Sequence, residues 1–214
     1  MSIVKDNRKR WISICCTLAM CITLCIPAQA YVLCNYKMTG TWYDEYYYLS
    51  TQSVTQDGRT VNYGNITDDA VEEWNDAVDA TSTSSLDIAL SETTDGDDTT
   101  TRVVVDALDR GPTDWRGFTY YYKYNALTGK WSTVNYGGYP NKNYTSGSAV
   151  INLYYVHDDP LWKIQNTIMH EMGHIFGLKH SLTDGALMIE GSASYTELTP
   201  PQSDDVSGVR ALYD

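Results

Sequence analysis

The sequence predicts an α/β, or layered α+β, domain, and three features carry that prediction. Short runs rich in valine and tyrosine, separated by polar turns, extend through residues 86–155 and are typical of strands. A helical apolar stripe precedes them, and a longer one follows at residues 160–176. The order strand, helix, strands, long helix and closing helix therefore indicates layers of helices packed on a sheet.

The first thirty residues have the pattern of a secretory signal peptide. Basic residues precede an apolar run from Trp11 to Ile26, and Pro27-Ala-Gln-Ala30 resembles a small-residue cleavage site. An uncleaved membrane anchor is the alternative, but the run is shorter than the roughly 20 residues that a spanning helix needs. We expect residues 31–214 to form one secreted, extracellular domain, which is long enough for a single well-buried core.

The charge and the cysteines agree with export. The chain has a net charge of −12, and removing residues 1–30, with four basic residues and Asp6, gives −15. An acidic surface argues against nucleic acid or anionic membranes as partners. Four of the five cysteines lie in residues 1–30, so Cys34 remains alone and no disulfide is expected within the domain. Such sparing use of cysteine favours a bacterial type of secreted protein.

The elements before the long helix follow in order. Thr67 is a candidate N-cap for a helix whose apolar face is Val71, Trp74, Ala77 and Val78. Four further segments show strand or hairpin patterns. They are strands at Leu86–Leu90 and Arg102–Val105, a hairpin over 118–136 that turns at Asn125–Gly129, and a last strand at Ser148–Tyr155.

The long helix carries the main chemical signal. Asp159 and Pro160 suit its start, and an apolar stripe predicts that it packs on a core. His170 and His174 lie one turn apart on one face, with Glu171 beside them. A continued helix would carry His180 about 9 Å further along the axis, at roughly 1.5 Å per residue. The helix must therefore end, and Gly177 is a suitable C-cap.

These residues predict a catalytic zinc site. Three histidine ligands, His170, His174 and His180, leave the fourth tetrahedral position to water, as catalytic zinc sites do. Zinc lowers the pKa of that water towards about 7. Glu171 would take its proton as general base and pass it to the leaving amine of a cleaved peptide bond.

The string from His170 to His180, followed by Met188, resembles the metzincin zinc endopeptidases. Three features resemble the matrixins in particular. They are Ser181 directly after the third histidine, the eight-residue spacing from His180 to Met188, and the stretch from Leu198 to Tyr213. The resemblance is specific over about residues 160–214. It implies a zincin-like catalytic domain with a twisted, mostly parallel sheet, an active-site helix, a turn at Met188 (the Met-turn) beneath the metal, and a C-terminal helix.

The resemblance also implies finer details. Glu190 stands where some metzincins have a tyrosine ligand, and the chain has no histidine-rich loop, so one zinc is expected. The last strand would be the sheet edge that binds substrate, and Ile189–Leu198 would line an apolar specificity pocket. Asp204 and Asp205, on a helix capped by Thr199-Pro-Pro-Gln202, would brace the Met-turn.

Several alternatives stay open at this stage. The histidines could serve a catalytically idle zinc-binding or adhesion module, or a metal-dependent hydrolase of a non-peptide bond. The acidic loop Thr94–Thr99 could bind Ca²⁺ or form only a turn. His157 is expected in a loop rather than at the metal. Cys34 lacks the surroundings of a latency cysteine and is expected to be an incidental thiol. We expect a monomer that acts on protein or peptide substrates.

Overall fold

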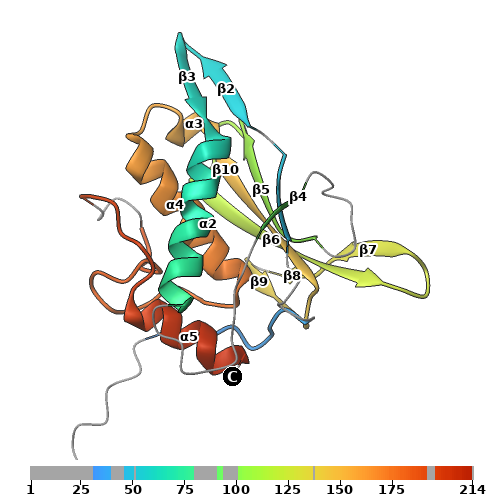
Figure 1. Cartoon of the computed structure of the whole chain (residues 1–214). Coiled ribbons are helices and arrows are strands. Elements are labelled where there is room, and N and C mark those ends of the chain that lie inside the picture. The colour runs from blue at the N-terminus through green and yellow to red at the C-terminus, as the bar shows by residue number, and fades with distance from the viewer. Residues whose placement is uncertain are drawn as a thin grey trace, which may run out of the picture.

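The computed structural model describes residues 31–39, 46–50, 52–79, 91–93, 101–136, 138–191 and 196–213. A six-stranded sheet with the order β4-β1-β5-β10-β6-β7 forms its centre (Figure 1). Within the described residues β4, β1, β5 and β10 are parallel, whereas β6 is antiparallel to both β10 and β7. The strands of this sheet are β1 (Tyr46–Leu49), β4 (Ser91–Thr93), β5 (Thr101–Leu108), β6 (Gly117–Asn125), β7 (Lys130–Thr133) and β10 (Ser146–Asn152).

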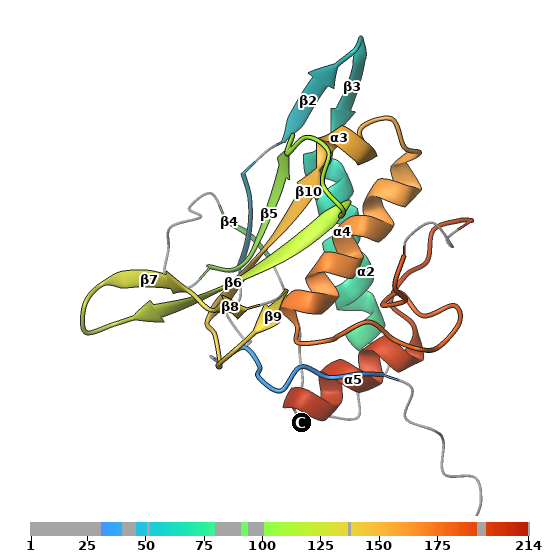
Figure 2. The same ribbon diagram turned by 180° about the vertical axis from the view of Figure 1, so that it is seen from behind.

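The helices form the second layer. Helix α4 (Leu161–Ile175) packs against β10 and β6, and α2 (Tyr63–Asp79) packs against α4 (Figure 2). The Trp74 indole N–H donates to the Met169 carbonyl at 3.0 Å and so joins the two helices within the core. The predicted α/β layered fold is therefore observed. Two small sheets accompany it, one of β2 (Ser53–Gln56) and β3 (Arg59–Asn62), the other of β8 (Asn135–Tyr136) and β9 (Tyr139–Pro140).

Two of the predicted strand segments match the structure closely. The predicted strand at Arg102–Val105 is the centre of β5, whose residues alternate between buried and half-buried. The predicted hairpin over 118–136 is β6 and β7, and the Asn125 side chain accepts hydrogen bonds from the backbone N–H groups of Leu127 and Thr128 in the turn. The segment 86–90, the loop 94–99 and residues 1–30 lie outside the described residues.

Strand β10 corrects two expectations. It ends at Asn152 rather than at Tyr155, because the Asn152 side chain accepts a hydrogen bond from Tyr154 N–H and caps the short helix α3 (Leu153–Val156). It also lies between β5 and β6 rather than at the edge of the sheet. All seven of its residues are buried, as expected for an internal strand.

The predicted helix caps are wrong at three places. Helix α2 begins four residues before Thr67, which is buried inside it, and the Asn62 side chain accepts from Asn65 N–H in the manner of an N-cap. The carboxylate of Asp159 does not cap α4; it pairs with Arg116 and, at 3.5 Å, with Lys163.

Helix α5 (Ser203–Tyr213) begins after Gln202, not after Thr199, and the Gln202 N–H donates to the Asp205 carboxylate at 2.8 Å. The predicted end of α4 is correct, since its C-cap is Phe176 and Gly177 adopts a left-handed φ of 97°. No helix in the part of the chain that the structure describes is long and apolar enough to cross a membrane.

Candidate metal centre

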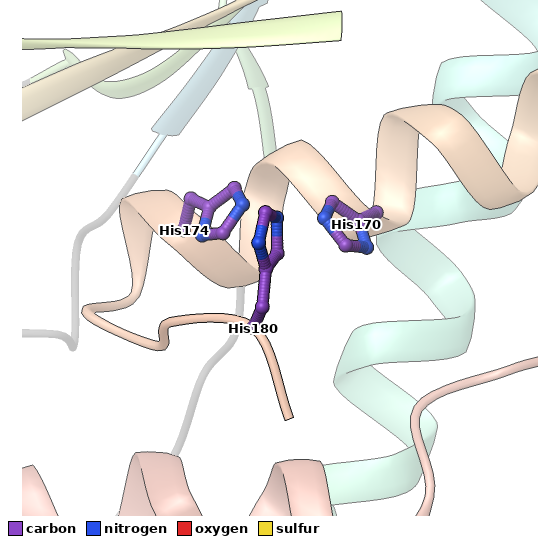
Figure 3. A group of neighbouring side chains, drawn as sticks. All are labelled: His170, His174 and His180. Carbon is purple, nitrogen blue, oxygen red and sulfur yellow. The ribbon is translucent and has the colours of Figure 1, made fainter. Parts of the chain in front are cut away.

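Three histidines converge at the end of α4. His170 and His174 project from the helix, and His180 comes back towards them from the segment that follows it (Figure 3). One ring nitrogen from each lies within 4.8 Å of the others, and the ring centroids are 4.8–5.2 Å apart. His170 and His174 are buried, while the His180 side chain is 33% exposed. The structure therefore brings the three predicted ligands together.

Backbone carbonyls fix the ring orientation of the two buried histidines. The Nδ1 atom of His170 lies 2.8 Å from the Leu187 carbonyl, and that of His174 lies 2.8 Å from the Leu178 carbonyl. A carbonyl only accepts, so Nδ1 must carry the proton in each ring. Each Nε2 then has a free lone pair, which is the form that binds a metal.

Burial keeps these imidazoles neutral. Desolvation lowers the pKa of His170 to about 4 and lowers the pKa of His174 well below its usual value. The pKa of His180 is also lowered, chiefly by burial, although the nearby Glu190 opposes that change. The cluster is therefore unprotonated at neutral pH and can accept a cation without first losing protons.

The segment that returns His180 is held by the N-terminal part of the domain. Cys34 N–H donates to the Gly177 carbonyl at 2.8 Å, and Lys179 N–H donates to the Val32 carbonyl at 2.7 Å. The Cys34 thiol is buried beside the Leu178 carbonyl, and among the described residues the candidate ligand cluster contains only the three histidines. Burial raises the pKa of Cys34 to about 11, so the thiol stays protonated. This environment does not favour a role in latency.

Glu171, next to His170 on α4, points towards β6. The Thr119 hydroxyl donates to Glu171 Oε2 at 2.7 Å, and Gly117 provides space beside the carboxylate. A Cβ atom at position 117 would lie 2.6 Å from Oε1, so only glycine fits there without displacing Glu171. Burial raises the pKa of Glu171 to about 7, opposed by the Thr119 hydrogen bond. A carboxyl group with that pKa can both accept and return a proton near neutral pH.

A pocket of about 380 Å³ opens beside these residues. His170, Glu171 and His180 line it on the cluster side. The rest of its wall comes from the segment that leads into β6, from α4 and from the segment after Met188, namely Asp114, Trp115, Arg116, Gly117, Thr167, Glu190 and Gly191. A molecule in this pocket would contact Glu171, His170 and His180 at once.

Met188 packs against α4 at Gly173, which precedes His174. Its sulfur packs so closely on Gly173 that a side chain at position 173 would collide with it. The Asp205 carboxylate accepts hydrogen bonds from the backbone N–H groups of Leu187 and Met188 at 3.0 and 3.2 Å. Leu187 in turn holds His170 through its carbonyl. The expectation that Asp205 braces this turn agrees with these contacts, and Asp204 accepts from the Ser181 hydroxyl at 2.8 Å.

Sequence reasoning missed the residues that β6 brings to the site. Thr119 and Gly117 contact Glu171 from more than fifty positions away, and no motif marks either one. His157 is placed as expected, away from the cluster. It is buried, with its ring nitrogens 3.3 Å from the Tyr63 hydroxyl and 3.1 Å from the Arg59 carbonyl.

The chain is similar to known proteins in both sequence and fold. The model of a peptidase family described as Matrixin matches residues 58–214. A search of curated proteins gave no match. Among solved structures, the chain is similar to one titled "GM1 bound form of the ECX AB5 holotoxin". The identity is 14%, the TM-score is 0.51, and the alignment covers 86% of this chain and 88% of that one. At that identity the likeness concerns the fold alone.

Proposed function

The chain belongs to the matrixin family of peptidases, and we propose that it is a zinc-dependent endopeptidase with Glu171 as its general base and His170, His174 and His180 as its metal ligands. One observation carries the proposal. Three neutral imidazoles form one cluster, and two of them, His170 and His180, line the same pocket as Glu171, a buried carboxyl group with a pKa of about 7.

The donor set fits zinc. Three ring nitrogens, two of them with their tautomers fixed by carbonyls, are a usual ligand set for catalytic zinc and leave one position open. When bound, zinc supplies Lewis acidity, which lowers the pKa of water and polarises a carbonyl group.

The protein's own residues would handle the proton and the geometry. Glu171 accepts a proton from the attacking water and delivers it to the leaving amine, while the Thr119 hydroxyl keeps Oε2 in place. Met188 and its turn, which Asp205 braces, form the floor that orients His170 through the Leu187 carbonyl. We assign this turn as the Met-turn of the family and α5 as its C-terminal helix.

The segment after Met188 is proposed to supply the specificity wall. Asn166 of α4 anchors its far end, because its amide donates to the Glu197 carbonyl and accepts from Thr199 N–H, each at 2.9 Å. Residues 192–195 of this segment lie outside the described residues. We expect a preference for a hydrophobic residue just after the cleaved bond, as the family resemblance implies.

The other functions considered fit less well. An idle zinc-binding module has no use for a buried carboxyl group directed into a pocket. Burial of Glu171 destabilises the folded state, and such a module would gain nothing in return. A hydrolase of non-peptide bonds would use the same chemistry, but the family favours peptides. We further propose that residues 1–30 direct export, that the mature chain is 31–214, and that it acts as a secreted monomer.

The test is Glu171→Ala in the mature chain. We expect loss of casein and peptide hydrolysis while zinc remains near one ion per chain, because the glutamate handles the proton and does not bind the metal. Glu72→Ala, an exposed change on α2, is the matched control and should keep full activity. Retention of most activity by Glu171→Ala, or a wild-type protein that binds no zinc, would contradict the assignment.

A further inference from the structure

The histidine cluster borders a pocket at His170 and His180, and a tyrosine of β9 packs against His174. The pocket wall comes from residues 114–117, from α4 and from the segment at 190–191, with no residue of β8 or β9 among those that line it. On the opposite side, the Tyr139 ring of β9 stands edge-on to His174, with ring centroids 5.8 Å apart. A backbone hydrogen bond from His180 and the Lys179 ammonium, 5.2 Å from the ring centroid, hold Tyr139 there. The hairpin of β8 and β9 therefore closes one end of the site.

The same hairpin covers part of the β6 edge. One edge of β6 pairs with β10, and the other carries β7, but only along Tyr122–Asn125. Along the remaining stretch, Gly117–Tyr121, no strand of the described residues pairs with this edge, although β8 contacts its Tyr121 end through Asn135. The stretch runs past Glu171, because Thr119 contacts that carboxylate. An uncovered strand edge at a site of peptide chemistry is a natural place for a substrate main chain to pair.

Asn135 occupies half of this edge with its side chain. Its Nδ2 donates to the Thr119 carbonyl at 2.9 Å, and its Oδ1 accepts from Tyr121 N–H at 2.6 Å. The next outward group, the Tyr121 carbonyl, accepts from Val134 N–H at 2.9 Å. One amide thus makes the two hydrogen bonds that a neighbouring strand would make there. Since alternate residues of a strand face the same edge, the groups left for another chain are those of Gly117 and the N–H of Thr119.

We propose that Asn135 and the β8–β9 hairpin limit strand pairing by the substrate to Gly117 and Thr119, so that the enzyme recognises its substrate mainly on the carboxyl side of the cleaved bond. On the amino side, no more than about two residues would find a partner, given that alternate residues pair. This inference rests on the proposed peptidase function, and it concerns which part of a substrate that enzyme can hold.

The direction in which a substrate peptide runs along β6 follows from how this strand pairs. Both of its observed neighbours are antiparallel, and antiparallel pairs are about two to three times more common than parallel ones. An antiparallel peptide runs from the Tyr121 end of β6 towards Gly117. Its amino-terminal part therefore reaches Asn135 and Tyr139, and its carboxyl-terminal part extends beside the open pocket.

The first experiment measures kcat/KM on two peptide series with one fixed cleavage site. One series has one to five residues before the cleaved bond, and the other has one to five after it. For the wild-type protein we expect a plateau beyond the second residue on the amino side and a rise of about tenfold or more on the carboxyl side. The inference would be overturned if kcat/KM kept rising with length on the amino side, reached a plateau on the carboxyl side only, or rose equally on both sides.

The second experiment removes the side-chain amide of Asn135. Asn135→Ala frees the Thr119 carbonyl and Tyr121 N–H, so longer amino-side peptides should gain about two- to fivefold in kcat/KM, the value of one modest hydrogen bond. Asn65→Ala, at an exposed asparagine on α2, is the matched control and should keep the wild-type plateau. A plateau that Asn135→Ala leaves unchanged would overturn the role of this residue.

A third measurement does not depend on turnover. In ¹⁵N NMR spectra of the zinc-loaded Glu171→Ala protein, an added peptide should shift the Gly117 and Thr119 amides and leave the Tyr121 amide in place. A larger shift at Tyr121 than at Thr119 would overturn the inference. The proposed function fails separately if the wild-type protein hydrolyses no peptide of either series. In that case kcat/KM has no length dependence to compare, and the inference is rejected together with the function.

Discussion

Glu171→Gln is expected to stabilise the metal-free protein, and to do so increasingly as the pH rises. Burial raises the pKa of this carboxyl group from 4.5 to about 7. The folded protein therefore binds the Glu171 proton more tightly than the unfolded chain does. The resulting stability is fully present below about pH 4.5 and is lost as the pH rises through about 7, because the ionised group must then stay buried.

The magnitude follows from the same two pKa values. Each pKa unit is worth about 1.4 kcal/mol, so ionised Glu171 costs the folded state about 3 kcal/mol above pH 7. At pH 5 most of that cost is absent, since folded Glu171 is still protonated. Glutamine keeps the shape and an acceptor for Thr119 but never ionises. We expect the free energy of unfolding of Glu171→Gln to exceed that of the wild type by about 2–3 kcal/mol more at pH 8 than at pH 5.

Urea unfolding of the chelated proteins at pH 5 and pH 8, followed by circular dichroism, measures this difference. The comparison of variant and wild type cancels the histidines, which titrate in both proteins. Glu72→Gln, at an exposed position of α2, should show the same stability difference from wild type at both pH values. If Glu171→Gln behaves in the same way, the carboxyl group is not destabilised by burial, and the argument for its proton transfer near neutral pH fails.

Three further changes test the surroundings of the site. Gly117→Ala places a Cβ atom 2.6 Å from Glu171 Oε1, so kcat/KM should fall about 100-fold with zinc content unchanged; full activity would show that the carboxylate can move aside. Asp205→Ala removes the carboxylate that accepts from Leu187 N–H and Met188 N–H, and urea unfolding should reveal a loss of about 3 kcal/mol in the free energy of unfolding. Cys34→Ser should leave peptidase activity within about twofold, and the wild-type thiol should react slowly with thiol reagents below pH 9, because burial raises the pKa of Cys34 to about 11. A large rise in activity of Cys34→Ser would instead establish a latency switch.

The caps and strand ends show where local sequence patterns were insufficient. Asp159 and Thr199 are both good capping residues, yet neither caps its helix. Arg116, 43 positions away, attracts the Asp159 carboxylate, and Asp205 takes the capping role that Thr199-Pro-Pro-Gln202 suggested. Similarly, Asn152 ends β10 because its side chain binds both Tyr154 N–H and the loop at Arg110. Tertiary partners compete with local ones for such short polar side chains.

Local sequence patterns were enough to predict the histidine cluster and the layered fold. His170 and His174 share a helix face by the pitch of the helix, and Gly177 ends the helix because glycine tolerates a left-handed φ, here 97°. These are local rules, which hold whatever the rest of the chain does. The surroundings of the cluster, in contrast, depend on tertiary contacts. Strand β6 places Thr119 and Gly117 beside Glu171, and Asn135 of β8 binds the Thr119 carbonyl. Their roles depend on contacts across long stretches of chain, which no spacing in the sequence records.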